Sequence, residues 1–266
     1  MLTATNIHFG FGNRTVLNGV SLTLAEGEFV CLAGPNGSGK TTLLRILLNH
    51  YRAPGQITWS GRPLDQWTTR QLSQLVAYLP QSPTFEPTQT VADIIKLGRS
   101  PHWSAFGLES PADTHIVTQV AAQLALTDDL DRPLLELSGG QRQRVFLARC
   151  LAQQPRAMLL DEPGTHLDIK HQVELIKLLQ HLATDQKLAI LMASHDLNLA
   201  AALSTRLILL HNGQVAAAGP PADVLKPQIL RQVYEVDLEL IPRPNRPQLV
   251  FPRIGFTPEE PNVHGA

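Results

Sequence analysis

The sequence predicts an α/β fold in which a parallel sheet with covering helices carries an antiparallel β layer and an inserted helical subdomain. A glycine-rich loop, Gly34–Thr41, joins an apolar strand to a helix. Apolar strands and amphipathic helices alternate between Leu159 and Leu210, and parallel strands need such crossover helices. Between Pro87 and Glu136 the strand patterns give way to segments rich in Ala, Leu and Gln, which indicates the helical insertion.

The composition sets broad limits on class and partners. The chain has 266 residues, 43% hydrophobic and 17% charged, so it can bury a core as one large or two small domains. A formal net charge of -1 gives no overall bias toward nucleic acid or an anionic membrane surface. The cysteines, Cys31 and Cys150, build no disulfide scaffold, which fits a reducing cytosol.

Apolar runs such as Leu188–Ala193 are far shorter than the ~18–20 residues that span a bilayer. The N-terminus, Met1–Gly10, has no basic start followed by an apolar stretch. We therefore expect a chain that is neither exported nor membrane-spanning by itself.

In the N-terminal third the sequence predicts short strands around the glycine-rich loop. Apolar and polar residues alternate from Val20 to Leu24, Phe29–Ala33 is a continuous apolar strand, and Ile57–Ser60 lies between glycines as a hairpin arm. These patterns predict a mixed, partly antiparallel β layer. The composition of Thr42–His50 predicts a helix directly after the loop.

In the middle of the chain Val91–Leu97 and His115–Leu126 are helical by composition, and Ser100-Pro101 and Ser110-Pro111 interrupt the pattern. After the insertion, leucines at helical spacing mark a helix that covers the sheet: Leu175, Leu178, Leu179 and Leu182. Leu188–Ala193 and Leu207–Leu210 are the next strands.

The predicted organisation is one domain over residues 1–240 followed by a proline-rich tail over 241–266. The domain divides into a core of 1–86 and 141–240 and a helical subdomain of about 87–140. Six prolines exclude a compact helix in the tail, and we expect Thr257–Ala266 to be loose. They are Pro242, Pro244, Pro247, Pro252, Pro258 and Pro261.

The glycine-rich loop is predicted to bind a polyphosphate. Its glycines let backbone amides turn toward one point, where the positive end of the following helix and the Lys40 ammonium add charge. Thr41 places a hydroxyl where Mg²⁺ bridging the β- and γ-phosphates would sit. The candidate nucleotide-binding residues are Gly34, Pro35, Asn36, Gly37, Ser38, Gly39, Lys40, Thr41 and Thr42.

Polar residues that follow apolar strands form a second candidate group. Asp161 can hold Mg²⁺ through water, and Glu162 can orient and polarise an attacking water. His195 ends another buried strand and could reach a γ-phosphate, while Gln81 could touch Mg²⁺ or its water. An Asp-Glu pair also suits a solvated strand end, and a lone histidine is usually structural, so the phosphate loop upstream is what favours the functional interpretation.

The pentapeptide Leu137, Ser138, Gly139, Gly140 and Gln141 precedes a helix predicted over Arg142–Ala152. A Ser-Gly-Gly entry leaves amides and a hydroxyl free at the positive helix end, which indicates a second anion site. An ordinary helix N-cap is the alternative.

Together these motifs resemble those of the ATP-binding subunits of ABC transporters over roughly Leu2–Arg253. The resemblance implies a P-loop NTPase core, with a RecA-like parallel sheet, an antiparallel β subdomain and an inserted α-helical subdomain. It makes Gly34–Thr41 the Walker A loop, Leu137–Gln141 the signature and Gly164–Asp168 the D-loop. The implied catalytic residues are Glu162, His195, Lys40 and Gln81, and the implied Mg²⁺ residues are Thr41, Gln81 and Asp161.

The resemblance also implies that Phe11 stacks on adenine, with Phe9 as the competing candidate and a core role open for either. It implies a head-to-tail homodimer in which ATP lies between Walker A of one chain and Ser138 and Gly140 of the other. Asp168 would then communicate across the interface. Gly164 departs from the family pattern, which usually has a hydroxyl residue there.

Two further segments resemble the importer ATPases for iron chelates (siderophores), haem and cobalamin: Leu97–His102 and His195–Ala200. The implied function is an ATPase at the cytoplasmic face of the cell membrane, energising uptake through separate polytopic permease subunits and, indirectly, a substrate-binding protein. The segment near Gln81 to His102 would contact the permease. Leu97–His102 also suits a helix end stopped by proline, with Arg99 compensating the helix dipole.

The alternative function is a soluble ABC ATPase in iron-sulfur cluster assembly or DNA maintenance. Long coiled-coil insertions and zinc-ligand cysteines, which mark several soluble relatives, are absent from the sequence. A degenerate module without turnover conflicts with the joint presence of Lys40, Glu162 and His195. We expect no nucleic-acid partner.

Overall fold

A six-stranded sheet with the order β10-β9-β3-β8-β7-β6 forms the centre of the molecule. The computed structural model describes residues 1–104, 107–165, 167–244 and 246–253. Neighbouring strands of this sheet pair in parallel, except that the edge strand β10 pairs antiparallel with β9. The strands are β3 (Phe29–Ala33), β6 (Val76–Leu79), β7 (Ala157–Asp161), β8 (Ala189–Ser194), β9 (Arg206–His211) and β10 (Gln214–Gly219).

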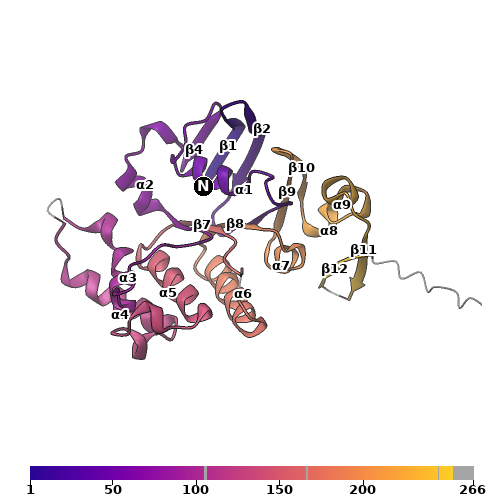
Figure 1. Cartoon of the computed structure of the whole chain (residues 1–266). Coiled ribbons are helices and arrows are strands. Elements are labelled where there is room, and N and C mark those ends of the chain that lie inside the picture. Colours follow the sequence, from indigo (N-terminus) through magenta and orange to yellow (C-terminus); the bar gives the residue numbers. More distant parts are fainter. Residues whose placement is uncertain (105–106, 166, 245, 254–266) are drawn as a thin grey trace, which may run out of the picture.

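An antiparallel sheet with the order β2-β1-β4-β5 lies against one face of the central sheet (Figure 1). Its strands are β1 (Leu2–Phe11), β2 (Arg14–Leu24), β4 (Gln56–Trp59) and β5 (Arg62–Pro63). Helix α1 (Lys40–Leu47) packs in the same core as these strands, and Trp59 donates its indole N–H to the Leu47 carbonyl at 2.9 Å.

The opposite face of the central sheet is covered by helices. Figure 1 shows α3, α4 and α5 gathered at one end of the molecule, away from β1 and β2. The helices on this face are α3 (Val91–Leu97), α4 (Pro111–Gln123), α5 (Gly139–Ala152), α6 (Ile169–Thr184), α7 (Leu197–Leu203), α8 (Pro221–Val224) and α9 (Pro227–Tyr234). Helix α2 (Thr69–Leu75) instead packs through Leu72 and Leu75 in the core that contains the antiparallel sheet. Short 3-10 turns span Leu64–Gln66, Ser100–His102, Thr127–Asp129 and Leu134–Glu136.

Two hydrophobic cores lie on the two faces of the sheet, and β3 supplies both. Cys31 and Ala33 point into the helical core, whereas Val30 and Leu32 point toward α1 and the antiparallel sheet. Successive strand residues face opposite sides, so a continuous apolar run is what a strand buried on both faces requires. This arrangement confirms the predicted α/β fold class, with its parallel sheet, antiparallel layer and helical region.

Several helix ends differ from the sequence-based expectation. Ser110-Pro111, read as an interruption, begins α4: Ser110 and Asp113 form a reciprocal capping box, and proline suits the first helical turn. Helix α5 begins at Gly139, before the expected Arg142, because Ser138 caps it. Helix α1 ends at Leu47 rather than His50, and Asn49 has a positive φ of 62°.

A β-hairpin of β11 (Leu238–Arg243) and β12 (Arg246–Pro252) follows the last helix. The prolines correctly argued against a helix there, but no hairpin was predicted. Asn198 of α7 fixes β12 by accepting from the Val250 amide at 2.8 Å and donating to the Val250 carbonyl at 3.1 Å. The expectation of a loose Thr257–Ala266 lies outside the described residues.

In the described part of the chain, every helix is too short or too polar to cross a membrane.

Candidate active site

The glycine-rich loop approaches β9 at Gly34 and β2 at Gly39 so closely that neither position has room for a side chain. A Cβ atom on Gly34 would lie 2.1 Å from the Leu210 carbonyl oxygen, and one on Gly39 would lie 2.6 Å from Leu17 Cδ2. Both glycines also have positive φ, 148° and 103°. The local sequence is therefore dictated by the path that the backbone takes from β3 into α1.

Lys40 folds back over this loop. Its Nζ donates to the carbonyl oxygens of Gly34 at 2.8 Å and Pro35 at 3.0 Å. Burial lowers the pKa of Lys40, and the nearby carboxylates of Glu162 and Asp161 act in the opposite direction. The ammonium is thus held at the mouth of the loop, where it can meet an anion.

One buried hydroxyl in the loop has no partner within the described structure. Ser38 Oγ is fully covered and no hydrogen bond reaches it. Buried polar groups are nearly always paired, and an orphan needs an explanation. A phosphate oxygen in the loop would satisfy Ser38, and this fits the predicted role of the loop.

Asp161 ends β7 next to the first turn of α1. Its Oδ1 accepts from the Thr41 hydroxyl at 3.0 Å, and its Oδ2 accepts from the Tyr78 hydroxyl at 3.4 Å. Burial raises the pKa of Asp161, and the Thr41 hydrogen bond only partly opposes this. Thr41 and Asp161 thus bring two oxygens together beside the loop, a donor set that suits Mg²⁺ shared with phosphate and water.

Three side chains converge on one oxygen of Glu162. Gln81 Nε2 donates to Oε2 at 3.0 Å, the Thr165 hydroxyl donates to it at 3.2 Å, and His195 Nδ1 lies 3.0 Å from it. Gln81, Glu162 and His195 follow the neighbouring strands β6, β7 and β8. The structure therefore brings these three predicted residues together at the carboxyl edge of the sheet, where ligands of open α/β sheets bind.

A cleft of about 660 Å³ opens between the loop and this edge. Phe11 is 52% exposed at its rim, whereas Phe9 stacks on Tyr51 with ring centroids 5.3 Å apart and packs against the core. The predicted residues that line the cleft are Phe11, Asn36, Gly37, Gly39, Lys40, Thr41, Thr42, Gln81 and Glu162. Residues that the sequence did not single out line it as well: Arg14, Thr15, Val16, Asn212 and Gly213.

The signature pentapeptide lies elsewhere. Among the described residues that line the cleft none belongs to Leu137–Gln141. Ser138 caps α5 by accepting from the Gln141 amide at 3.2 Å, while Gln141 Oε1 accepts from the Ser138 amide at 2.9 Å. The N-cap alternative is thus realised, and the exposed Ser138 hydroxyl proton stays available for an anion. Asp168, 65% exposed, caps α6.

Sequence reasoning missed two residues that touch the carboxylates. Tyr78 reaches Asp161 from a strand whose apolar pattern gives no sign of it. Thr165 could have been recognised from the sequence. Gly164 stands where the family pattern usually has a hydroxyl residue, and Thr165, the next residue, carries a hydroxyl. The structure shows that this hydroxyl bonds Glu162.

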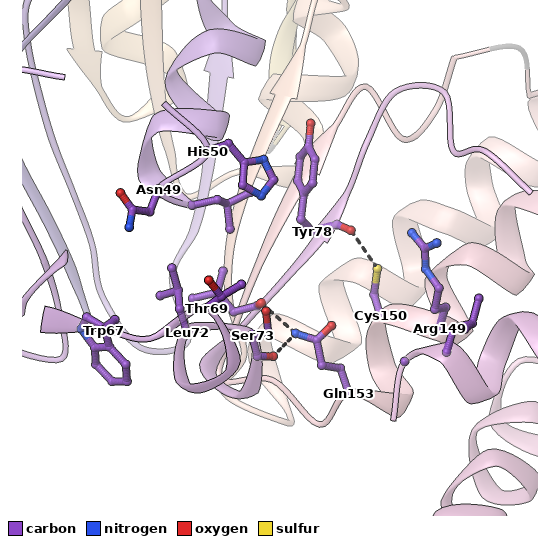
Figure 2. A pocket seen from close by; sticks show the side chains of 14 residues that line it. Asn49, His50, Trp67, Thr69, Leu72, Ser73, Tyr78, Arg149, Cys150 and Gln153 are labelled. Carbon is purple, nitrogen blue, oxygen red and sulfur yellow. Dashed lines mark hydrogen bonds between the residues drawn. The ribbon is translucent and has the colours of Figure 1, made fainter. Parts of the chain in front are cut away.

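A separate groove of about 350 Å³ runs between α2, β6, the end of α3 and α5 (Figure 2). Figure 2 shows Gln153 reaching from α5 to the backbone of Ser73, and Cys150 Sγ pointing at the Tyr78 carbonyl at 3.6 Å. These bonds link the C-terminal end of α5 to α2 and to β6 of the central sheet. Leu97 and Gly98, from the segment expected to contact a permease, line this groove.

A glycine-rich loop between strand and helix, a buried lysine over it and carboxylates at the adjacent strand end define the class of P-loop nucleotide-binding proteins. A family model described as "ABC transporter" matches residues 17–165. The chain therefore belongs to the ABC transporter family, among its ATP-binding, ATP-hydrolysing subunits.

The curated relatives match nearly end to end. The chain is 36% identical to the iron(3+)-hydroxamate import ATP-binding protein FhuC of Bacillus subtilis (strain 168), over 92% of this chain and 93% of that protein. It is 40% identical to the hemin import ATP-binding protein HmuV of Thermobifida fusca (strain YX), over 92% and 85%.

Among solved structures, the chain resembles a subunit of an inward-facing transporter described as being of the metal-chelate type. The TM-score is 0.81 at 26% sequence identity, and the match covers 94% of this chain and 95% of that one. The family and the fold class drawn from the motifs are both confirmed.

Proposed function

We propose that this chain is the ATP-hydrolysing subunit of an importer that takes up an iron chelate or haem through separate membrane permease subunits. The importer class rests on the similarity to proteins named for iron-hydroxamate and hemin import. Turnover rests on one observation, the convergence of Gln81, Thr165 and His195 on Glu162 beside the phosphate loop. Cobalamin, also implied by the sequence resemblance, stays a prediction.

In the proposed reaction the loop amides, Ser38 and Lys40 hold the triphosphate, and Phe11 stacks on the adenine. Glu162 orients a water molecule, which attacks the γ-phosphorus as the bond to the ADP oxygen breaks. His195 and Gln81 fix the Glu162 carboxylate. Mg²⁺, when bound, neutralises phosphate charge, and Thr41 and Asp161, with Gln81 nearby, are the residues that would hold it.

The test replaces Glu162 with glutamine, which keeps the side-chain shape and removes the carboxylate. We expect Glu162→Gln to bind ATP with unchanged affinity, to lose at least roughly a hundredfold in kcat, and to form a homodimer only when ATP is present. Nucleotide binding, phosphate release and light scattering measure these properties. Undiminished ATPase in Glu162→Gln would contradict the role given to Glu162.

We infer that the permease contacts the segment near Gln81 to His102 through the groove of Figure 2. Leu97 supports this inference because it is 41% exposed at the groove although it is apolar. Leu97→Glu should abolish co-purification with the permease while the ATPase of the isolated chain is unchanged. Leu108→Glu is the matched control, since Leu108 is 67% exposed outside the groove. A soluble stoichiometric complex in place of a permease would favour the iron-sulfur or DNA-maintenance alternative.

A further inference from the structure

The second glycine of the signature lies directly against a histidine of the next long helix. A Cβ atom on Gly140 would lie 2.5 Å from Cγ and 2.6 Å from Cδ2 of His171, closer than any real Cβ contact. Gly140 is buried, whereas a Cβ on Gly139 would meet nothing within 4 Å. The imidazole ring of His171 therefore occupies the space that a side chain at residue 140 would fill.

The same ring holds the D-loop aspartate. Asp168 Oδ1 lies 2.7 Å from His171 Nδ1 and accepts from the His171 backbone amide at 2.9 Å. The backbone hydrogen bond is an ordinary N-cap of α6, but the ring contact is not needed to cap a helix. His171 is only 22% exposed, so the ring is fixed between Gly140 on one side and Asp168 on the other.

A second contact joins the same two regions. Gln143 of α5 donates its side-chain amide to the Pro163 carbonyl at 2.8 Å, immediately after Glu162. The first two turns of α5 thus contact both sides of the D-loop, through Gln143 at Pro163 just before it and through Gly140 at His171, whose ring holds Asp168 at its end. Two contacts fix orientation as well as distance, so the signature turn and Asp168 are held as one unit.

We propose that His171 is a positioning residue that couples Asp168 to the signature turn, so that each subunit presents both groups to its partner's nucleotide in one fixed geometry. This inference rests on the proposed ATP-dependent dimer. His171 touches neither the cleft nor Glu162 in its own chain. Its effect should therefore appear in assembly of the dimer and in kcat, and not in the binding of ATP to one subunit.

The experiment compares three substitutions of His171 in the full chain. His171→Ala removes ring and bond, His171→Phe keeps a ring without the nitrogen, and His171→Asn keeps a donor near the Nδ1 position. In the Glu162→Gln background we expect His171→Ala and His171→Phe to weaken ATP-dependent dimerisation roughly five- to tenfold, the loss of one charge-assisted hydrogen bond. His171→Asn should recover most of it.

The matched control is His181→Ala, because His181 forms a similar pair with Asp185 at 2.6 Å near the far end of α6. It should dimerise as the parent does, and all variants should bind ATP as monomers with parental affinity. Unchanged dimerisation in His171→Ala would overturn the inference, as would His171→Asn being no better than alanine. If the Glu162→Gln parent itself fails to dimerise with ATP, both the proposed function and this inference are contradicted.

Discussion

Glu162 has an unusual backbone for a residue that is not glycine. Its φ is 51°, in the left-handed region, and its amide donates to the Ala193 carbonyl of β8 at 3.0 Å. Such a conformation costs about 1 kcal/mol or more and persists where the surroundings enforce it. Here it turns the carboxylate toward Gln81, Thr165 and His195 instead of along the strand. The backbone strain therefore lies at Glu162, the residue that we propose orients the attacking water.

Thr165 is the member of this group whose removal is simplest to interpret. Thr165→Val keeps the shape and loses the hydrogen bond to Glu162, while Thr165→Ser keeps the hydroxyl. We expect valine to lower kcat roughly three- to tenfold with little change in KM, because a bond to a charged group is lost away from the nucleotide. Steady-state ATPase assays measure both parameters. A serine variant as slow as valine would mean that the methyl group, and not the hydroxyl, matters.

Spacing and residue type were enough to predict that Lys40, Thr41, Asp161 and Glu162 belong to one site, because a phosphate site needs those groups in that order. They were not enough for Tyr78. The sequence of an apolar strand does not show whether its tyrosine packs in the core or donates a hydrogen bond to a carboxylate. Which face a strand residue takes depends on the neighbouring strand. That information is tertiary and is absent from the local pattern.

At the scale of elements, Arg99 has a role that its sequence context did not suggest. One interpretation of the sequence has Arg99 compensating the dipole of α3. In the structure its side chain is 6% exposed and its Nε lies 2.8 Å from Asp113 Oδ1, with Asp113 4% exposed. Its Nη1 also donates to the Ala152 carbonyl at 2.7 Å. Arg99 therefore joins the start of α4 to the end of α5. Next to it, Gly98 is required because a Cβ would lie 2.0 Å from the Arg149 carbonyl oxygen.

Removing this arginine should destabilise the helical region strongly. Arg99→Ala leaves the Asp113 carboxylate buried without its partner, which typically costs about 3–5 kcal/mol. Lys96→Ala is the control, because its ion pair with Glu109 at 3.3 Å is partly exposed and such pairs contribute about 0–1 kcal/mol. Thermal or denaturant unfolding measures the difference. Equal losses in the two variants would contradict a structural role for the Arg99 pair.

The same pair makes a prediction for acid stability. Burial raises the pKa of Asp113, but hydrogen bonds from Ser110 and Arg99 outweigh it and hold the pKa at about 2 rather than 3.8. A lowered carboxyl pKa contributes stability that is fully present above pH ~4 and disappears as the pH falls toward ~2. The stability gap between wild type and Asp113→Asn should therefore narrow across that interval. A gap that is constant with pH would show that the charge of Asp113 is not what stabilises the fold.

The elements that were predicted less well depend on contacts between residues that lie far apart in the sequence. The hairpin β11-β12 is rich in proline, so its strands have a weak pattern, and they are held by Asn198 far away in sequence. Gln248 adds a bond to the Leu225 carbonyl at 3.1 Å. By contrast β3, buried on both faces, was predicted with the bounds it has. The local sequence pattern predicts the bounds of an element only where the burial of its side chains is itself periodic or continuous.

At the scale of the molecule, the groups predicted for one reaction lie on two separate surfaces of the chain. Phe11, Lys40 and Glu162 line the cleft, whereas Ser138 is exposed at the start of α5 and does not line it. A binding site that used both would need two chains facing each other. This separation supports the shared sites that the family resemblance implies.

Shared sites predict that two inactive variants restore each other. Lys40→Met disables the phosphate loop, and Ser138→Asp keeps the N-cap of α5 but places a negative charge opposite the phosphate. Each variant alone should be nearly inactive. A mixed dimer retains one intact site, made of the loop from the Ser138→Asp chain and the signature from the Lys40→Met chain. Purified mixed dimers should therefore recover up to roughly half of the wild-type ATPase rate per dimer, since one of their two sites is intact.

Two differently tagged chains, purified through both tags in the presence of ATP, establish that mixed dimers have formed before the rate is measured. A mixture of two Lys40→Met preparations is the control and should stay inactive, since neither of its sites has a working loop. Mixed dimers without recovered activity would place the loop and the signature in sites that are not shared. Recovery requires that the cleft of one chain be completed by the helix end of the other, which is the geometry that the two separate surfaces demand.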